Sequence, residues 1–308
     1  MLPDLSVQLA PENQHGLLIS NPVMAASGTF GYGTEYAELM DIQKLGAIIC
    51  KGTTLKPRPG NPQPRLVETA AGVLNSIGVE NIGIEALIRE KAPVWAGWSV
   101  PVIVNILGTN IDEYSELAQL LDGVAGVSGI EVNISCPNVS AGGAEFGSSP
   151  EAAAEVTTAV KANTTLPVIV KLSPNVTDIT EIACAVAEAG CDAISLINTL
   201  KGKAIDTTIR RPVLGSVCGG LSGPAIKPVA LYMVYQVARA VDVPVIGCGG
   251  IATVNDALEF IFAGANAIQI GTATFSDPRI SLTILEGIEQ FMIKEGIRQM
   301  SQMVGTAA

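Results

Sequence analysis

The segment Asn133–Asn138 reads Asn-Ile-Ser-Cys-Pro-Asn and carries the side chains best suited to proton transfer. Its thiol, Cys136, stands among amides and a hydroxyl, directly after the apolar run 129–132, which predicts a buried strand. The chain has a single histidine, His15, near its N-terminus, where we expect a turn. Because imidazole is the usual acid–base group of enzymes, proton chemistry here needs another base, and Cys136 is the leading candidate.

Eight short apolar runs predict the strands that must position such groups. The runs do not alternate between apolar and polar residues, as expected for parallel strands that are buried on both faces. Several follow Gly-Ala, Leu-Pro or Val-Pro, which are turns that lead from a helix into a strand. The runs cover residues 21–27, 47–52, 101–107, 129–135, 167–173, 193–199, 244–250 and 267–273.

Segments with helical spacing alternate with these runs. Ser149, Asp178 and Thr253 are suited to cap three of the helices, and Asp256 lies in the first turn after Thr253. We expect helices near residues 34–45, 112–123, 150–162, 178–189, 224–240, 253–263 and 278–294. Eight strands that alternate with helices predict an α/β fold, a (β/α)8 TIM barrel. A doubly wound open sheet is the alternative, but no G-x-G-x-x-G sequence follows the first strand.

Three other segments depart from this alternation. Residues 5–9 alternate in polarity and residues 11–16 favour a turn, so an N-terminal β-hairpin is predicted. Residues 54–100 are too long for one connection, and residues 200–222 lack helical periodicity. Long ordered loops on a barrel often cover or bind ligands, so both are predicted to be inserted active-site loops. No linker is evident, and we expect residues 1–308 to form a single domain.

The composition excludes several classes of protein. Lys and Arg number 18 against 29 Asp and Glu, a net charge of −11, which argues against binding to nucleic acid or to anionic membranes. No apolar run is long enough to span a bilayer. The six cysteines include no C-x-x-C pair, so no metal or iron–sulfur site is predicted in this chain. Without a signal peptide, we expect a cytoplasmic protein with reduced thiols.

Polar residues follow nearly every predicted strand at its carboxyl end, where barrel enzymes place their chemistry. Burying two lysines and three asparagines together is unfavourable unless a ligand pairs with them. The glycine loops after the last two strands predict a phosphate site, and ordinary tight turns are the alternative. The strand-end residues are Ser27, Lys51, Asn105, Asn133 with Cys136, Lys171, Asn198 with Thr199, Gly249-Gly250, and Gly271-Thr272.

Over nearly its whole length the chain resembles the class 1B dihydroorotate dehydrogenases, the FMN-containing catalytic subunits of an NAD-linked enzyme of pyrimidine synthesis. The membrane-bound class differs by an N-terminal extension and a serine base. The fumarate-using class 1A shares the cysteine base, but residues 51–54 and 142–147 are more similar to class 1B. The resemblance rests on residues 21–31, 51–58, 60–65, 75–79, 133–139 with 142–143 and 146–147, 197–199, 220–223 and 247–250.

This resemblance implies the oxidation of dihydroorotate to orotate in de novo synthesis of UMP. Cys136 would remove the C5 proton while hydride passes from C6 to FMN. Because a free thiol has a pKa of about 8.5, its thiolate must be favoured locally or formed at alkaline pH. FMN would contact Ser27, Lys51, Gly52, Asn105, Asn133, Lys171, Ile197, Gly223, Gly249, Gly250, Gly271 and Thr272. The substrate would contact Lys51, Asn75, Ser76, Ile77, Gly78, Val79, Asn133, Asn198 and Thr199.

The resemblance also implies a partner subunit that carries FAD and an iron–sulfur cluster, in a heterotetramer of two catalytic and two electron-transfer subunits. Three alternatives stay open: a class 1A-type fumarate-dependent enzyme, another flavin-dependent pyrimidine or enoate reductase, and a phosphate-binding barrel without activity. Lys56, Arg58 and Arg65 form a basic loop that could steer an anionic substrate, contact a partner or simply face solvent.

Overall fold

Eight parallel strands form a closed barrel in the computed structural model, which describes residues 2–135, 137–138 and 144–307. Around the barrel the strands follow the order β11-β12-β17-β18-β3-β4-β7-β8. Their bounds are β3 Val23–Ala25, β4 Ala47–Ile49, β7 Val102–Ile106, β8 Gly129–Asn133, β11 Val168–Lys171, β12 Ala193–Leu196, β17 Val245–Cys248 and β18 Ala267–Ile270. Each predicted run contains one of these strands, so the predicted barrel is confirmed.

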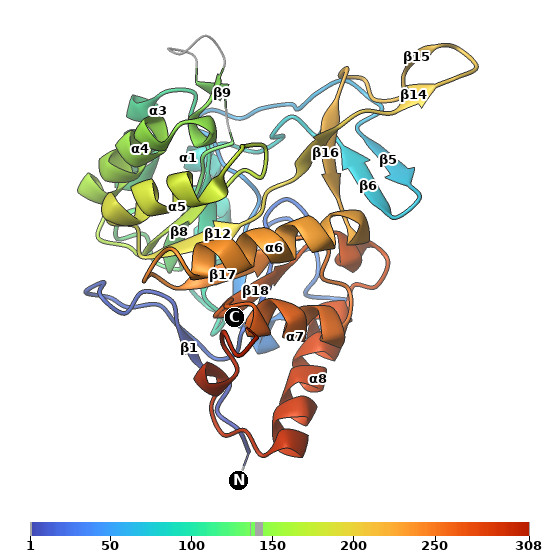
Figure 1. Cartoon of the computed structure of the whole chain (residues 1–308). Coiled ribbons are helices and arrows are strands. Elements are labelled where there is room, and N and C mark those ends of the chain that lie inside the picture. The colour runs from blue at the N-terminus through green and yellow to red at the C-terminus, as the bar shows by residue number, and fades with distance from the viewer. Residues whose placement is uncertain (1, 136, 139–143, 308) are drawn as a thin grey trace.

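Helices cover the outside of the barrel between successive strands (Figure 1). Ser149, Asp178 and Thr253 accept hydrogen bonds from first-turn amides, as predicted, and Thr253 forms a reciprocal capping box with Asp256. These caps satisfy amides that have no partner within the helix. The helices are α3 Ile111–Leu121, α4 Pro150–Ala162, α5 Ile179–Glu188, α6 Lys227–Ala238, α7 Val254–Phe262 and α8 Ile280–Glu295.

The helix expected over residues 34–45 is wrong. The segment forms a series of turns and one short 3-10 helix, η1 (Ile42–Lys44). The Tyr36 ring stacks on Phe30 at a centroid distance of 4.1 Å, and its hydroxyl donates to the Thr29 carbonyl at 3.0 Å. Asp41 has an extended backbone and caps η1. These tertiary and capping contacts override the local helical preference of the segment.

The two inserted segments pair with each other. Strands β5 (Leu66–Thr69) and β6 (Gly72–Asn75) join β13 (Leu200–Gly202) and β16 (Gly219–Ser222) in a sheet of order β13-β16-β6-β5. This sheet stands beside the barrel mouth, and the β14–β15 hairpin (Ile205–Asp206 and Arg211–Pro212) projects beyond it (Figure 1). The first insertion also contains α1 (Ile84–Ala86), the π-helix η2 (Leu87–Lys91) and α2 (Ala92–Trp95). The insertions therefore form an ordered wall.

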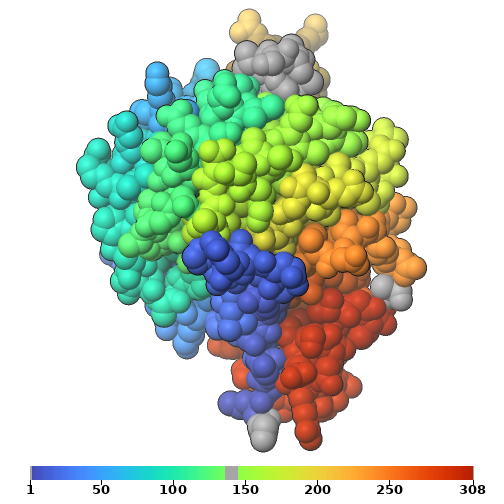
Figure 2. Space-filling view, turned by 90° about the vertical axis from the view of Figure 1, so that its left-hand side faces the viewer, coloured from blue at the N-terminus to red at the C-terminus, as the bar shows by residue number. Residues whose placement is uncertain are grey.

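The predicted N-terminal hairpin is confirmed, with β1 (Val7–Gln8) antiparallel to β2 (Leu18–Ile19) and His15 in the turn region. Its Leu9, Leu17 and Ile19 are buried in one cluster with side chains from the barrel interior, among them Ile103. Figure 2 shows this N-terminal segment, in blue, lying across the barrel surface. Because the hairpin closes the amino end of the barrel, the carboxyl end is left for ligands.

Within residues 2–135, 137–138 and 144–307, no helix combines the length and the apolar character needed to cross a membrane.

Candidate active site

A cavity of about 1210 Å³ opens at the carboxyl ends of the barrel strands. Every residue predicted to contact cofactor or substrate lines this cavity, from Ser27 after the first barrel strand to Thr272 after the last. Cys136 lies outside the described residues, so its role as the base stays a prediction. Pockets for one drug-sized ligand measure roughly 300–1,000 Å³. The cavity therefore has room for a nucleotide-sized ligand together with a second small molecule.

A polar layer inside the barrel forms the floor of the cavity. Glu131 on β8 lies at the centre of this layer and is fully buried. No other ionisable side chain on the described strands is as deeply buried. The Glu131 carboxylate accepts hydrogen bonds from Asn105 at 2.7 Å, Ser195 at 2.9 Å and Gln269 at 2.7 Å. These donors come from β7, β12 and β18. Closing the barrel is what brings the four side chains together.

Lys171 stands at the end of β11 and is 4% exposed. Its ammonium donates to the Gln269 carbonyl oxygen at 2.5 Å and lies 4.0 Å from Glu131 Oε2. Burial acts to lower the pKa of Lys171, but interactions with Cys248 and Glu131 outweigh it, and the pKa is raised overall. The cavity floor therefore presents a cation to any ligand.

Asn105 presents an unsatisfied acceptor beside this cation. Its Nδ2 group donates to Glu131, whereas its Oδ1 atom is buried and has no partner among the described residues. A Cβ atom at Gly52 would lie 3.1 Å from this oxygen, so glycine there avoids a close contact with it. A buried carbonyl oxygen without a partner is unfavourable in a folded protein. A ligand N–H at the cavity floor would satisfy it.

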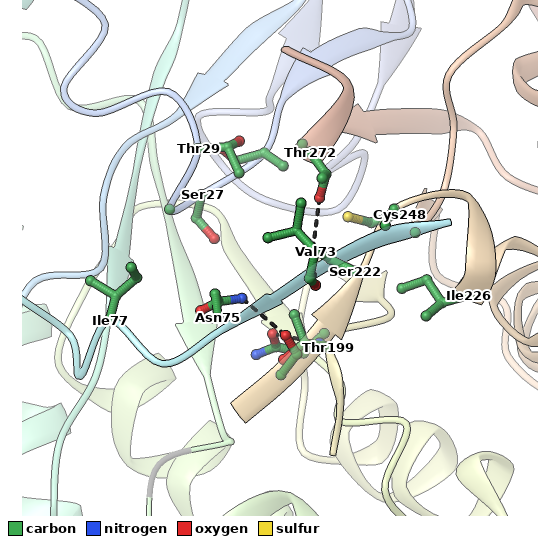
Figure 3. A pocket seen from close by; sticks show the side chains of 18 of the residues that line it. Ser27, Thr29, Val73, Asn75, Ile77, Thr199, Ser222, Ile226, Cys248 and Thr272 are labelled. Carbon is green, nitrogen blue, oxygen red and sulfur yellow. Dashed lines mark hydrogen bonds between the residues drawn. The ribbon is translucent and has the colours of Figure 1, made fainter. Parts of the chain in front are cut away.

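The opposite wall is built from glycine loops that follow β17 and β18. Gly250 has φ +77°, and a Cβ there would lie 2.8 Å from the Lys227 backbone nitrogen, so only glycine fits without strain. Thr272 Oγ1 donates to Ser222 Oγ at 2.8 Å and joins the loop after β18 to the end of β16, as Figure 3 shows. The short helix η5 (Thr272–Phe275), which begins after Gly271, has no side-chain N-cap. Backbone amides at such a helix start are suited to an anion.

The polar groups of the cavity floor and the glycine loops of the opposite wall test whether FMN fits the site. The unsatisfied Asn105 oxygen and the Lys171 ammonium offer one acceptor and one cation, which complement the N–H and carbonyl groups on the pyrimidine edge of a flavin. The glycine loops offer close approach of backbone amides, which suits a phosphate group. The residues present therefore fit the predicted cofactor at both of its polar ends.

Amides and hydroxyls gather on the remaining side of the cavity. Asn198 Nδ2 donates to Asn133 Oδ1 at 3.3 Å and to Ser135 Oγ at 3.1 Å. Asn75 ends strand β6, and its Nδ2 donates to the Gly220 carbonyl at 3.2 Å. Figure 3 shows Ser27, Asn75 and Thr199 around this space. Such a set can bind a planar ligand that has both N–H and C=O groups.

Several residues of the site were not among the predicted ones, and Glu131, Gln269, Cys248 and Glu145 are among them. Glu131 and Gln269 each lie two residues before a predicted site residue, and a period of two places them on the same strand face. That spacing was a usable signal. Cys248 lines the cavity and interacts with Lys171. Glu145 also lines it and pairs with the exposed Lys201 at 2.9 Å, which no local pattern indicates.

The basic loop has a structural partner. Arg65 pairs with Glu80 at 2.5 Å and donates to the Pro59 carbonyl at 2.8 Å. Its guanidinium therefore ties the first insertion together, which was not one of the roles considered for it.

Comparisons with known proteins agree with this arrangement. A family model described as "Dihydroorotate dehydrogenase" matches residues 10–292. Proteins named "Dihydroorotate dehydrogenase B (NAD(+)), catalytic subunit" from Geotalea uraniireducens and Citrifermentans bemidjiense are each 56% identical over 98% of both chains. The protein of that name from Pelobacter propionicus is 56% identical over 99% of both chains.

Proposed function

The chain belongs to the dihydroorotate dehydrogenase family, and on this premise we propose that it is the catalytic subunit of an NAD-linked enzyme that oxidises dihydroorotate to orotate in pyrimidine synthesis. One observation supports this most directly. A single cavity combines a cation, an unsatisfied amide oxygen, a glycine-rich wall and a cluster of asparagines. These groups complement a flavin and a small planar acid together.

FMN is the cofactor in this proposal, and when bound it supplies the acceptor for the two electrons of the reaction. Lys171 and Asn105 would hold its pyrimidine edge. Backbone amides after Gly249 and Gly271 would bind its phosphate. The other predicted contacts lie around the same cavity, and they are Ser27, Lys51, Gly52, Asn133, Ile197, Gly223, Gly250 and Thr272.

Dihydroorotate has a carboxylate and an imide-like edge. We assign the edge to the amides of Asn75, Asn133 and Asn198, and the carboxylate to Lys51 with backbone groups of residues 76–79. Thr199 lies beside them. The hydrogen bonds that join Asn198 to Asn133 and Ser135 support this assignment, because they hold the amides in one orientation before the substrate binds.

Cys136 is the proposed base for the C5 proton. Its support is positional, since Ser135, the residue before it, lines the cavity and accepts a hydrogen bond from Asn198 at 3.1 Å. The thiolate would take the proton from a carbon held next to the electron acceptor.

The relatives' names describe catalytic subunits, which supports a partner that completes the enzyme. We propose that this partner carries FAD and an iron–sulfur cluster and passes the electrons to NAD. Two catalytic and two electron-transfer subunits would form the heterotetramer.

An anaerobic absorption spectrum of the purified protein tests the proposal. The expected result is a flavin spectrum that bleaches on addition of dihydroorotate and recovers with NAD only when the partner is present. Recovery with fumarate alone would indicate a class 1A-type enzyme. A colourless protein, or a flavin that dihydroorotate does not bleach, would contradict the proposal.

A further inference from the structure

We propose that Glu131 is a positioning residue of the flavin site, which keeps Lys171 charged and turns the Asn105 carbonyl oxygen toward the cavity. This inference rests on the proposed FMN site. It assigns a role to a buried carboxylate that the proposed reaction does not use. Glu131 acts through its neighbours, because Asn105 and Lys171, and not Glu131 itself, line the cavity.

The first step concerns Lys171. Gln269 connects it to Glu131, since the Gln269 amide donates to Glu131 at 2.7 Å and accepts from Lys171 at 2.5 Å. A carboxylate only accepts and an ammonium only donates, so the amide can satisfy both in one orientation alone. The Lys171 ammonium is therefore held at the cavity floor by a fixed chain of hydrogen bonds.

The second step concerns charge. Lys171 faces Glu131 from β8, Cys248 from β17 and Gln269 from β18. Gln269 carries no charge, and Cys248 is a thiol whose pKa burial raises. Glu131 is the carboxylate among these three neighbours, and it lies 4.0 Å from the buried ammonium. Removing it would leave Lys171 buried without a carboxylate partner.

The third step concerns Asn105. Its amide could adopt either orientation, and the acceptor oxygen of Glu131 at 2.7 Å selects the one with Nδ2 toward Glu131. The Oδ1 atom is then left without a protein partner. Glu131 consequently sets both polar features of the floor, an acceptor at Asn105 and a cation at Lys171. A bound ring matches these two features if it has an N–H group that donates to Asn105 and, next to it, an acceptor for Lys171.

The test measures FMN affinity at several pH values, by the fluorescence of free FMN in equilibrium with the holoprotein. We expect Glu131→Gln to weaken FMN binding by at least about tenfold at pH 7. In the wild-type protein Lys171 stays charged between pH 7 and 9, so affinity stays flat. Glu131→Gln removes one of the interactions that offset the burial of Lys171, so we expect its pKa to fall and the affinity to decrease further as pH rises. Wild-type affinity with a flat profile in Glu131→Gln would overturn the inference.

Ser195→Ala is the matched control, since it removes one neutral hydrogen bond to Glu131 and keeps the carboxylate. We expect its FMN affinity to stay within about threefold of wild type, with a flat pH profile. A loss as large as that of Glu131→Gln would mean that any disturbance of the layer has this effect, and would contradict the charge role.

A double-mutant cycle with Lys171→Met separates positioning from general structure. Glu131→Gln should weaken FMN binding at least about fivefold less in the Lys171→Met background, because the unpaired ammonium is then absent. Equal losses in the two backgrounds would overturn the inference.

Glu131→Gln alone could fail to fold. In that case, folding of the double variant would support the inference, and failure of both variants to fold would show a merely structural role for Glu131. Wild-type protein that holds no FMN would overturn this inference together with the proposed function, whereas an additive cycle would remove this inference alone.

Discussion

The hydroxyl of Tyr114 donates a hydrogen bond of 2.7 Å to the backbone carbonyl oxygen of Asn133. Tyr114 belongs to α3 and is fully buried, and its ring meets Phe146 edge to face at 5.6 Å. The contact anchors the end of β8 at the point where the chain enters the segment that contains Cys136. A helix on the outside of the barrel thereby supports the cavity rim.

Replacing Tyr114 with Phe should separate this anchor from packing. The ring stays, and loss of the hydrogen bond to the Asn133 carbonyl should lower the free energy of unfolding by about 1 kcal/mol. We expect dihydroorotate-dependent flavin bleaching to slow several-fold while FMN content stays normal, as measured by stopped-flow absorbance. Tyr235→Phe on α6 is the control, because Tyr235 does not line the cavity. Equal bleaching rates in both variants would contradict the anchor role.

Asn198→Ala should affect the substrate more than the cofactor. It removes the hydrogen bonds to Asn133 at 3.3 Å and to Ser135 at 3.1 Å, and it leaves the glycine wall untouched. We expect FMN to stay bound and orotate affinity, measured by the shift of the flavin spectrum, to fall at least about tenfold, since an amide assigned to the substrate edge is lost. An unchanged orotate affinity would remove Asn198 from the proposed substrate site.

Gly250→Ala should expel FMN. Its Cβ would lie 2.8 Å from the Lys227 backbone nitrogen and 2.9 Å from the Gly223 carbonyl oxygen, at φ +77°. Gly190→Ala is the matched control, because Gly190 has φ +89° but no atom within 4 Å of the added Cβ. Both variants should lose about 1 kcal/mol of stability from backbone strain. Only Gly250→Ala should be purified with little flavin, and normal flavin in that variant would contradict the proposed phosphate wall.

The described cysteines should differ in reactivity. Burial raises the pKa of both Cys50 and Cys191 to about 12, whereas Cys218 is exposed. Because the thiolate is the reactive form, iodoacetamide at pH 8 should label Cys218 quickly and leave the two buried thiols unlabelled in the native protein. Peptide mass spectrometry measures this. Labelling of Cys50 at the rate of Cys218 would show that the barrel opens under native conditions.

Stability at acid pH should depend on Asp256. Burial acts to raise its pKa, but the hydrogen bond from Lys227 at 2.7 Å and those from the α7 cap outweigh it, so the pKa is lowered. A carboxyl with a lowered folded-state pKa stabilises the fold above its unfolded pKa, and this contribution is lost as pH falls through the folded value. Asp256→Ala should therefore lose about 1 kcal/mol near pH 7, and the difference should shrink below pH 4.

Thermal unfolding of both proteins at pH 7 and pH 3.5 measures that difference. Glu259→Ala is the control, since this partner of Lys227 is 45% exposed and such pairs contribute about 0–1 kcal/mol. A constant difference between wild type and Asp256→Ala across this pH range would contradict the assigned ionisation.

The local features of the barrel follow from the sequence alone. Apolar runs such as 167–173 become buried strands and capping residues such as Thr253 begin helices, because both depend on neighbours a few residues away. The strand-end residues could be predicted as one site for a similar reason. Parallel strands in a barrel bring all their carboxyl ends to one face, so order along the chain is sufficient to group Lys51, Asn105 and Lys171.

Tertiary structure decided the contacts between residues far apart in the chain. Turns replaced the helix expected over 34–45 because Tyr36 stacks on Phe30, and the two insertions became one sheet through pairing between β6 and β16. Glu131 was missed because its partners Asn105, Ser195 and Gln269 come from three other strands, the last of them 138 residues away. Only strand register in the closed barrel sets such distances, since they depend on the geometry of all eight strands together.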